Sequence, residues 1–152
     1  MEACIKALDE QTDEATKQML QAVVNRKRKF KKYKQNHLMT VNACLIISMM
    51  FLLYIYFFIA KPYSYSFFSM FSVFVNSSVN FVCLVLSISM YGYMIVLKKK
   101  KDKAEKEFHA LRCEIIDKSK HLWKKDSSWN SRHKVFEMMK KNFDINLYHE
   151  NK

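Results

Sequence analysis

An uncharged stretch decides the fold of this 152-residue chain: residues 38–60 read LMTVNACLIISMMFLLYIYFFIA. No Asp, Glu, Lys or Arg occurs between residues 35 and 60. In an α-helix the 23 residues of the quoted stretch rise about 35 Å, more than the roughly 30 Å of a bilayer's hydrocarbon core. A buried helix of a soluble protein is usually shorter and carries a polar stripe, which this stretch lacks. Residues 38–60 are therefore expected to form a transmembrane helix.

A second uncharged stretch begins after Lys61 and runs from residue 62 to residue 97. Polar side chains interrupt its first half, at Asn76, Ser77, Ser78 and Asn80. We therefore place a short outer loop at residues 61–72 and the second transmembrane helix at residues 73–97. Amphipathic rings favour the headgroup boundary of a membrane. The aromatic residues that precede the second helix are expected there: Tyr63, Tyr65, Phe67, Phe68 and Phe71.

The basic residues predict an orientation. Residues 1–37 carry nine Lys or Arg and residues 98–152 carry sixteen, whereas the connecting loop carries only Lys61. Positively charged flanks stay in the cytoplasm, so both termini are expected inside the cell and the protein is expected in the plasma membrane, with multiple passes. The four cysteines avoid the outer loop, and no disulfide framework is implied.

Glycine and proline are almost absent from the sequence. The chain has one of each, Gly92 and Pro62, which leaves few places where it can reverse. A single glycine cannot build a phosphate-binding loop or a dinucleotide fingerprint. The sequence therefore predicts an all-α fold, a hairpin of two transmembrane helices continued by long amphipathic cytoplasmic helices over residues 1–37 and 98–152.

Both cytoplasmic regions show apolar residues at alternating spacings of three and four, a pattern typical of coiled coils. In the first region they are Met1, Ile5, Leu8, Thr12, Ala15, Met19 and Ala22. In the second they are Ala104, Phe108, Leu111, Ile115 and Leu122. We expect the first helix to continue unbroken into the membrane. The two regions are expected to pair as an antiparallel stalk, within one chain or between two copies in a homodimer.

A further short helix is expected at about residues 132–143, after residues that favour helix N-caps. A helix of this length is unstable alone, so it either folds back onto the stalk or docks onto a partner. Its apolar face would be the partner face: Phe136, Met139 and Phe143. Residues 144–152 are expected to be loosely held, with Ile145, Leu147 and Tyr148 apolar enough to serve as a binding segment.

Two basic blocks flank the uncharged stretches, RKRKFKKYK at residues 26–34 and KKKKDK at residues 98–103. Such blocks set topology, and they also attract anionic lipid headgroups. The residues expected to bind lipid are Arg26, Lys27, Arg28, Lys29, Lys31, Lys32, Lys34, Lys98, Lys99, Lys100 and Lys101. Phe30 and Tyr33 interleave the cations as in some nucleic-acid-binding segments, but a block held against a bilayer is a poor nucleic-acid site. We expect no nucleic-acid partner.

Small and polar residues mark a possible contact between the two transmembrane helices, where such residues commonly drive association. The expected interhelix seam consists of Cys44, Ser48, Asn80, Cys83 and Ser87, with Asn76 and Tyr91 extending the same face of the second helix. A transport pathway is the rival interpretation, but no ionisable residue lies inside either span to mark one.

The sequence offers little chemistry. Residues at spacing four share one helical face, namely Glu105, His109, Cys113, Asp117 and His121. A straight helix presents adjacent pairs and no closed four-ligand cage, so we assign no metal. Cys113 and His109 lack an orienting third group and an oxyanion-binding turn. We assign no catalytic residue and no cofactor, and we do not expect an enzyme.

Two runs in the C-terminal half carry a family resemblance: FHALRCEIIDKSKHLWKK at residues 108–125 and HKVFEMMKKNFDINLYHENK at residues 133–152. They resemble the small YpbF-like membrane proteins of Bacillus and relatives, whose two spans and basic flanks have the same layout. The resemblance implies a Gram-positive plasma membrane and carries over no catalytic residue.

The function expected from the sequence is that of a non-enzymatic integral membrane protein. Its cytoplasmic helices would bind an unknown membrane or cytoplasmic protein or associate with themselves. The alternative is an accessory subunit of a membrane complex that binds anionic lipid through its basic blocks.

Overall fold

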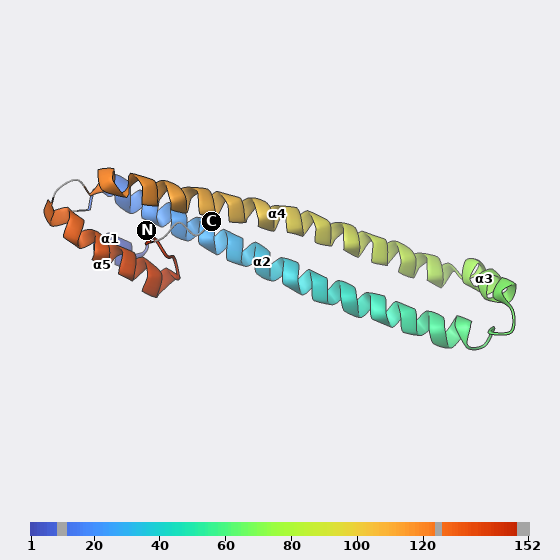
Figure 1. Ribbon diagram of the computed structural model, residues 1–152. Helices are drawn as coiled ribbons and strands as arrows, with labels where there is room; N and C mark the ends of the chain where they lie inside the picture. The colour runs from blue at the N-terminus through green and yellow to red at the C-terminus, as the bar shows by residue number, and fades with distance from the viewer. Residues whose placement is uncertain (9–11, 124–125, 149–152) are drawn as a thin grey trace. The chain divides into compact units, whose positions relative to one another are not determined.

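The computed structural model describes residues 1–8, 12–123 and 126–148. Within these residues all regular structure is helical, so the all-α fold class is confirmed. The elements are α1 (Ala3–Lys6), α2 (Glu14–Ile55), the π-helix η1 (Tyr56–Ala60), α3 (Phe67–Asn76), α4 (Ser78–Leu122) and α5 (Asp126–Phe143) (Figure 1). They form two compact units: unit 1 comprises Met1–Lys32 and Asp102–Lys152, and unit 2 comprises Tyr33–Lys101.

Helix α2 is unbroken for 42 residues, as expected from a stretch that contains neither glycine nor proline. It therefore continues through residues 26–37, as predicted. At its end the helix widens into η1, where the Lys61 N–H donates to the Tyr56 carbonyl at 2.9 Å, five residues back. Pro62 follows and has no N–H to donate, which ends the helix.

Two helical segments are long and apolar enough to cross a membrane, namely Glu14–Ala60 and Ser78–Ser119. Their most apolar windows have mean hydropathies of 2.5 and 1.9, and 6% of each window is buried. The core helix of a soluble protein is mostly buried, so the low burial distinguishes these segments from such a helix. This agrees with the two apolar helices that the sequence predicts.

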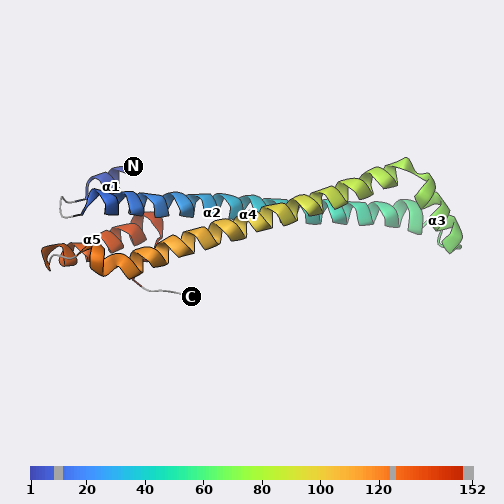
Figure 2. The ribbon, with the colours of Figure 1, turned by 90° about the horizontal axis from the view of Figure 1, so that it is seen from above.

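Unit 2 contains the predicted helical hairpin, but its second helix starts later than expected. Within this unit the last part of α2 and the first part of α4 run in opposite directions and are joined through α3 (Figures 1 and 2). Helix α4 begins at Ser78, not at residue 73, and α3 occupies much of the predicted loop. Ser77 separates the two helices with an extended backbone, φ −96° and ψ 111°. The break forms without glycine or proline, at the mostly polar residues 76–80 that interrupt the apolar stretch and that the prediction placed inside the second helix.

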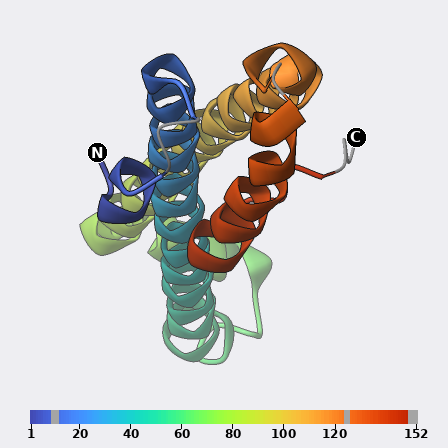
Figure 3. The ribbon, with the colours of Figure 1, turned by 90° about the vertical axis from the view of Figure 1, so that its left-hand side faces the viewer.

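Unit 1 has a hydrophobic core to which α1, α2, α4 and α5 all contribute (Figure 3). The buried members are Ile5, Leu20, Val23, Val24, Phe108, Leu111, Ile115, Trp123, Val135, Phe136, Met139, Ile145 and Leu147. The pattern predicted for α4 is confirmed by the burial of Ala104, Phe108, Leu111 and Ile115. The predicted pairing of the two cytoplasmic regions is confirmed within one chain, because α2 and α4 share this core, and α5 folds back onto them; the additional contribution of α1 as a separate short helix was not predicted.

The N-terminal region differs most from the prediction. The expected helix from Met1 is interrupted after α1, and α2 begins at Glu14; residues 9–11 lie outside the described part of the chain. Of the predicted positions, Ile5 and Thr12 are buried and Leu8, Met19 and Ala22 are partly buried against the core, whereas Ala15 is exposed. The buried positions on α2 are Thr16, Leu20, Val23 and Val24. The cause is tertiary, because packing against other helices selects which of two adjacent stripes is buried.

The C-terminal region is more ordered than predicted. Helix α5 begins at Asp126, six residues before the predicted start. After α5, Ile145 and Leu147 are 0% and 1% exposed in the core of unit 1. The expectation of a loosely held tail is therefore wrong for residues 144–148, and residues 149–152 lie outside the described part of the chain.

Candidate functional site

The first basic block is the main candidate site, and much of it is engaged by unit 1 itself. The Arg26 Nη1 donates to the Glu107 carbonyl at 2.9 Å, and Lys29 Nζ lies 3.8 Å from a Glu107 carboxylate oxygen. Arg28 pairs with Glu2 at 2.6 Å. These contacts join α2 to α4 and to the residues before α1. Arg26, Arg28 and Lys29 therefore make exposed polar contacts within unit 1, partners that the sequence did not indicate, while the stability of the unit rests mainly on its apolar core.

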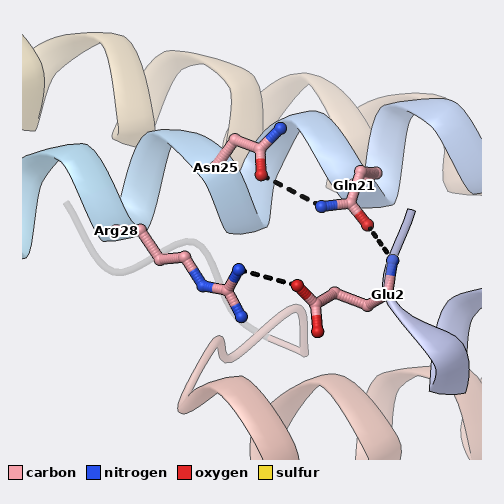
Figure 4. Close-up of polar contacts among 4 residues, drawn as sticks. All are labelled: Glu2, Gln21, Asn25 and Arg28. Atoms are coloured by element: carbon pink, nitrogen blue, oxygen red, sulfur yellow. Dashed lines mark hydrogen bonds and ion pairs between the residues drawn. The ribbon is translucent and has the colours of Figure 1, made fainter.

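Figure 4 shows how Arg28 belongs to a short polar chain along α2. The Glu2 backbone N–H donates to Gln21 Oε1 at 2.7 Å, and Gln21 Nε2 donates to Asn25 Oδ1 at 3.0 Å. The carboxylate of Glu2 accepts the Arg28 guanidinium. Because both the backbone and the side chain of Glu2 are bound, the start of the chain is fixed beside α2.

Lys27 contacts the chain just after α5. Its Nζ donates to the Asp144 carboxylate at 2.8 Å and to the Asp144 carbonyl, and it lies 5.8 Å from the centre of the Phe108 ring. Asp144 has a positive φ of 56°, a conformation that Asp and Asn tolerate better than most residues. The turn itself is closed by backbone hydrogen bonds from the Asp144 N–H to the Lys140 carbonyl at 3.0 Å and from the Ile145 N–H to the Met139 carbonyl at 3.1 Å, and Lys27 lies against its outer side.

The contact with Lys27 lowers the pKa of the Asp144 carboxyl. The hydrogen bond from Lys27, and then its charge, hold the pKa of the Asp144 carboxyl below its ordinary value of 3.8. A lowered carboxyl pKa stabilises the folded state above the ordinary pKa, and that stabilisation is lost as the pH falls through the folded pKa. Acid below about pH 4 is therefore expected to release this contact, whereas neutral pH preserves it.

Lys27→Met is expected to raise the pKa of Asp144 toward its ordinary value, because both the hydrogen bond and the charge are removed. The measurement is an NMR titration of the aspartate carboxyl carbons in the full chain. Lys118→Met is the matched control, since Lys118 pairs with Glu114 at 2.7 Å and lowers the pKa of that carboxyl instead. An unchanged Asp144 titration in Lys27→Met would contradict the assigned contact.

Five lysines of the predicted lipid-binding set are exposed and have no contact assigned above to the fold of either unit: Lys31, Lys32, Lys98, Lys99 and Lys100. Lys34 is also exposed and Lys101 is partly buried, and each makes an interaction of its own. The predicted lipid-binding set is thus divided into residues that make contacts within unit 1 and lysines that present charge to the solvent.

The predicted interhelix seam lies on the less exposed face of unit 2. Cys44, Ser48, Cys83 and Ser87 are partly buried, and Asn80 is fully buried. The donor of Ser87 is used within its own helix, on the Cys83 carbonyl at 2.8 Å, rather than across to the other helix. A hydrogen bond across the helices at these residues stays a prediction.

The prediction that Asn76 and Tyr91 extend the face of the interhelix seam is wrong. Asn76 and Tyr91 are exposed, whereas Met90 is partly buried. Each step of four advances 40° beyond a full helical turn, so two successive steps of four carry Tyr91 away from the face of Cys83. Alternating steps of three and four, as in Asn80, Cys83, Ser87, Met90, Met94 and Leu97, stay on the buried face.

The predicted partner face on the last helix is not exposed. Phe136 and Met139 are 4% and 0% exposed, and Phe143 packs against the same core. The Phe136 ring meets Trp123 and Tyr148 edge to face, with centroids 5.8 and 5.5 Å apart. The expectation of a partner at this face is therefore corrected: α5 folds back onto its own chain.

Over the described residues, no group of three or more His, Cys, Asp or Glu side chains is placed to hold a metal ion. The side chain of His121, the last residue of the spaced series on α4, lies outside this description.

Comparison with known proteins places the chain in a family without a described activity. Residues 19–150 match the family described as "Protein of unknown function (DUF2663)". The chain is 38% identical to the "Uncharacterized protein YpbF" of Bacillus subtilis (strain 168) over 152 residues, 100% of each chain. No solved structure gives a significant match.

Proposed function

The chain belongs to the DUF2663 family of proteins of unknown function, and from this premise we propose that it is a non-enzymatic integral membrane protein that binds anionic lipid. Its two apolar helices cross the plasma membrane as a hairpin with both termini in the cytoplasm. The folded unit 1 stands on the cytoplasmic side. Lysines beside the spans contact anionic headgroups.

One observation carries the membrane assignment. Of the large hydrophobic side chains that the structure describes as exposed, all but Met1 and Tyr148 belong to unit 2. Leu52, Phe58 and Ile88, for example, are 63–66% exposed. Contiguous apolar surface of this extent is rare on monomeric soluble proteins and indicates an apolar environment. Unit 1, in contrast, buries its large apolar side chains in its own core.

The charge distribution supports the orientation and the lipid contact. A basic block precedes the first apolar stretch at residues 26–34 and another follows the second at residues 98–103. The connection between the two stretches, in contrast, carries only Lys61. Lysines near a cytoplasmic leaflet each contribute about 1 kcal/mol of attraction to anionic lipid. We do not extend the proposal to a protein partner at Phe136, Met139 and Phe143, because that face is packed in the core of unit 1.

Replacing Lys31, Lys32, Lys98, Lys99 and Lys100 by glutamine is expected to lower the enrichment of phosphatidylglycerol and cardiolipin around the protein several-fold. These lysines are exposed, so their loss removes lipid attraction while the contacts of Arg26, Arg28 and Lys29 are kept. The enrichment is measured by lipid mass spectrometry on protein extracted with its native lipid in polymer nanodiscs.

The matched control for the lipid experiment removes five exposed lysines outside both basic blocks: Lys6, Lys106, Lys134, Lys140 and Lys141. This variant has the same net charge as the test variant and is expected to keep most of the enrichment. Raising the salt from about 0.05 M to about 0.5 M should weaken the wild-type enrichment by screening. Equal losses in the two variants, or no loss in the test variant, would refute the lipid proposal.

A further inference from the structure

Helix α3 has two apolar faces, of which the structure occupies only one. It packs against η1 within unit 2, and its partly buried residues are Ser69, Met70, Val73 and Phe74. On the other face, Phe67 and Phe68 are 80% exposed and Phe71 is 58% exposed. Three neighbouring phenylalanines on an otherwise uncharged helix are not suited to contact with water. This face therefore requires an apolar occupant.

The end of α3 is fixed by a single amide. Asn80 Nδ2 donates to the Phe74 carbonyl at 2.9 Å, and the Asn80 backbone N–H donates to the Ser77 carbonyl at 3.1 Å. The Asn80 side chain is fully buried. Asn80 thus satisfies one of the carbonyls that the C-terminus of α3 leaves free, while it belongs to the first turn of α4. The amide holds α3 and α4 as two separate helices.

The lengths explain why a break is needed. Residues 78–97 of α4 rise about 30 Å, which matches the hydrocarbon core of a bilayer without any contribution from α3. A straight helix over residues 67–97 would rise about 46 Å and exceed that thickness by half. The ten residues of α3 rise about 15 Å and cannot span a bilayer. Helix α3 is therefore not needed to cross the hydrocarbon core, and we do not expect it to lie within the spanning helix.

We propose that α3 lies in the headgroup boundary of the leaflet remote from the termini, with Phe67, Phe68 and Phe71 among the acyl chains. This inference rests on the proposed membrane function. The exposed face of α3 adjoins exposed apolar residues in sequence on both sides, Phe57 and Phe58 in η1 and Phe81 and Val82 in α4. Tyr65, 77% exposed just before α3, is a residue type enriched at this boundary.

The lipid boundary is favoured over a protein occupant by this distribution of apolar residues. Exposed apolar residues occur in η1, α3 and the start of α4, and Lys61, between η1 and α3, is the one charged residue in the sequence that joins them. A phospholipid leaflet can cover such an extended surface, whereas a protein partner commonly buries a bounded patch with a polar rim. Interfacial helices bury their apolar face about 5–10 Å into the boundary, a depth that can be measured.

The depth can be measured with nitroxide labels on single cysteines in the full chain, reconstituted into phosphatidylethanolamine–phosphatidylglycerol vesicles. The native Cys4, Cys44, Cys83 and Cys113 are first replaced by alanine. The test position is Phe68→Cys, and the equally exposed Phe67→Cys repeats it if one variant fails to fold. Ser64→Cys marks the loop and Ile88→Cys marks the middle of the span. The readout is the ratio of oxygen to nickel-chelate collision rates.

The label at residue 68 is expected about 5–10 Å below the phosphates, between an aqueous label at 64 and a label about 15 Å deep at 88. A label at 68 as aqueous as that at 64, or as deep as that at 88, would overturn the inference. Protection of residue 68 from both reagents would reveal a protein occupant and would also overturn it. An aqueous label at 88 would instead overturn the proposed membrane function itself.

Discussion

The double substitution Val85→Arg and Ile88→Arg is expected to abolish insertion of the second apolar helix. Both side chains are well exposed on the middle of its apolar part, 59% and 63%. In a bilayer each arginine at such a depth costs about 2.5–3.5 kcal/mol on the translocon scale. A combined cost of about 5–7 kcal/mol corresponds to more than a thousandfold change in an insertion equilibrium.

The insertion is measured by labelling Ser64→Cys, in a background without the native cysteines, with a membrane-impermeant maleimide added to intact cells. The parent protein is expected to react, and the mid-span variant to lose more than 90% of the labelling. The matched control is Tyr93→Arg with Val96→Arg, which has the same spacing of three and lies near the cytoplasmic end of the helix. There arginine reaches the headgroups, so labelling is expected to persist.

The two arginine variants separate membrane insertion from exposure to water. If unit 2 were surrounded by water, Val85→Arg and Ile88→Arg would improve solubility and would cost little. Labelling of the mid-span variant at the parental level would therefore contradict the membrane assignment. Loss of labelling in both variants would indicate a general folding defect and would contradict the depth on which the argument rests.

Phe136→Ala is expected to destabilise unit 1 by about 3–5 kcal/mol, the usual range for truncation of a buried phenylalanine. Phe136 is 4% exposed and contacts Trp123, Tyr148 and Arg132, whose guanidinium carbon lies 5.4 Å from the ring centre. A domain of this size has a free energy of unfolding of roughly 4–12 kcal/mol. The substitution therefore removes much of the stability of unit 1, up to its complete unfolding.

The stability is followed by tryptophan fluorescence of the full chain in micelles during denaturation by urea, and by protease resistance. Phe67→Ala is the matched control, because it makes the same truncation at a residue 80% exposed in unit 2. It should shift the unfolding of unit 1 by less than about 0.5 kcal/mol. Equal stability of Phe136→Ala and the parent would show that α5 is not packed as described, and would restore Phe136 as a candidate contact for a partner.

Those features of the fold that depend on composition alone were predictable. The position of the first apolar helix follows from the absence of charge between residues 35 and 60, and its continuity follows from the absence of glycine and proline in α2. The burial of Ala104, Phe108, Leu111 and Ile115 follows from a single clear apolar stripe. In each of these cases local sequence and tertiary packing favour the same structure.

Features decided by long-range contacts were not predictable. On α2, the stripe of Ala15, Met19 and Ala22 lies next to that of Thr16, Leu20 and Val23, and only packing against other helices selects the second. The break after α3, in contrast, is a local feature: it falls among the mostly polar residues 76–80 that the sequence shows, and the contact that was missed runs back six residues from Asn80 to the Phe74 carbonyl.

The candidate basic site was only half predictable, again because of long-range contacts. Its position beside the apolar helices follows from the sequence, whereas the partners of its residues do not. Lys27 and Asp144 are 117 residues apart, and Arg28 and Glu2 are 26 apart. A count of charges cannot distinguish a lysine that contacts another part of unit 1 from an exposed lysine without such a contact.

The division of unit 1 between the two ends of the chain imposes an order of events during synthesis. Its core needs Ile5 and Leu20 from the beginning and Ile145 and Leu147 from near the end. The roughly 120 residues between these sets take about 6–24 s to translate at about 5–20 residues per second. Phe108, Leu111 and Ile115 of α4 are made midway through this interval, so the core of unit 1 closes in stages and is complete only after Ile145 and Leu147. On the proposed membrane function, both apolar helices are synthesised before these last core residues, and the hairpin would enter the bilayer before the core is complete.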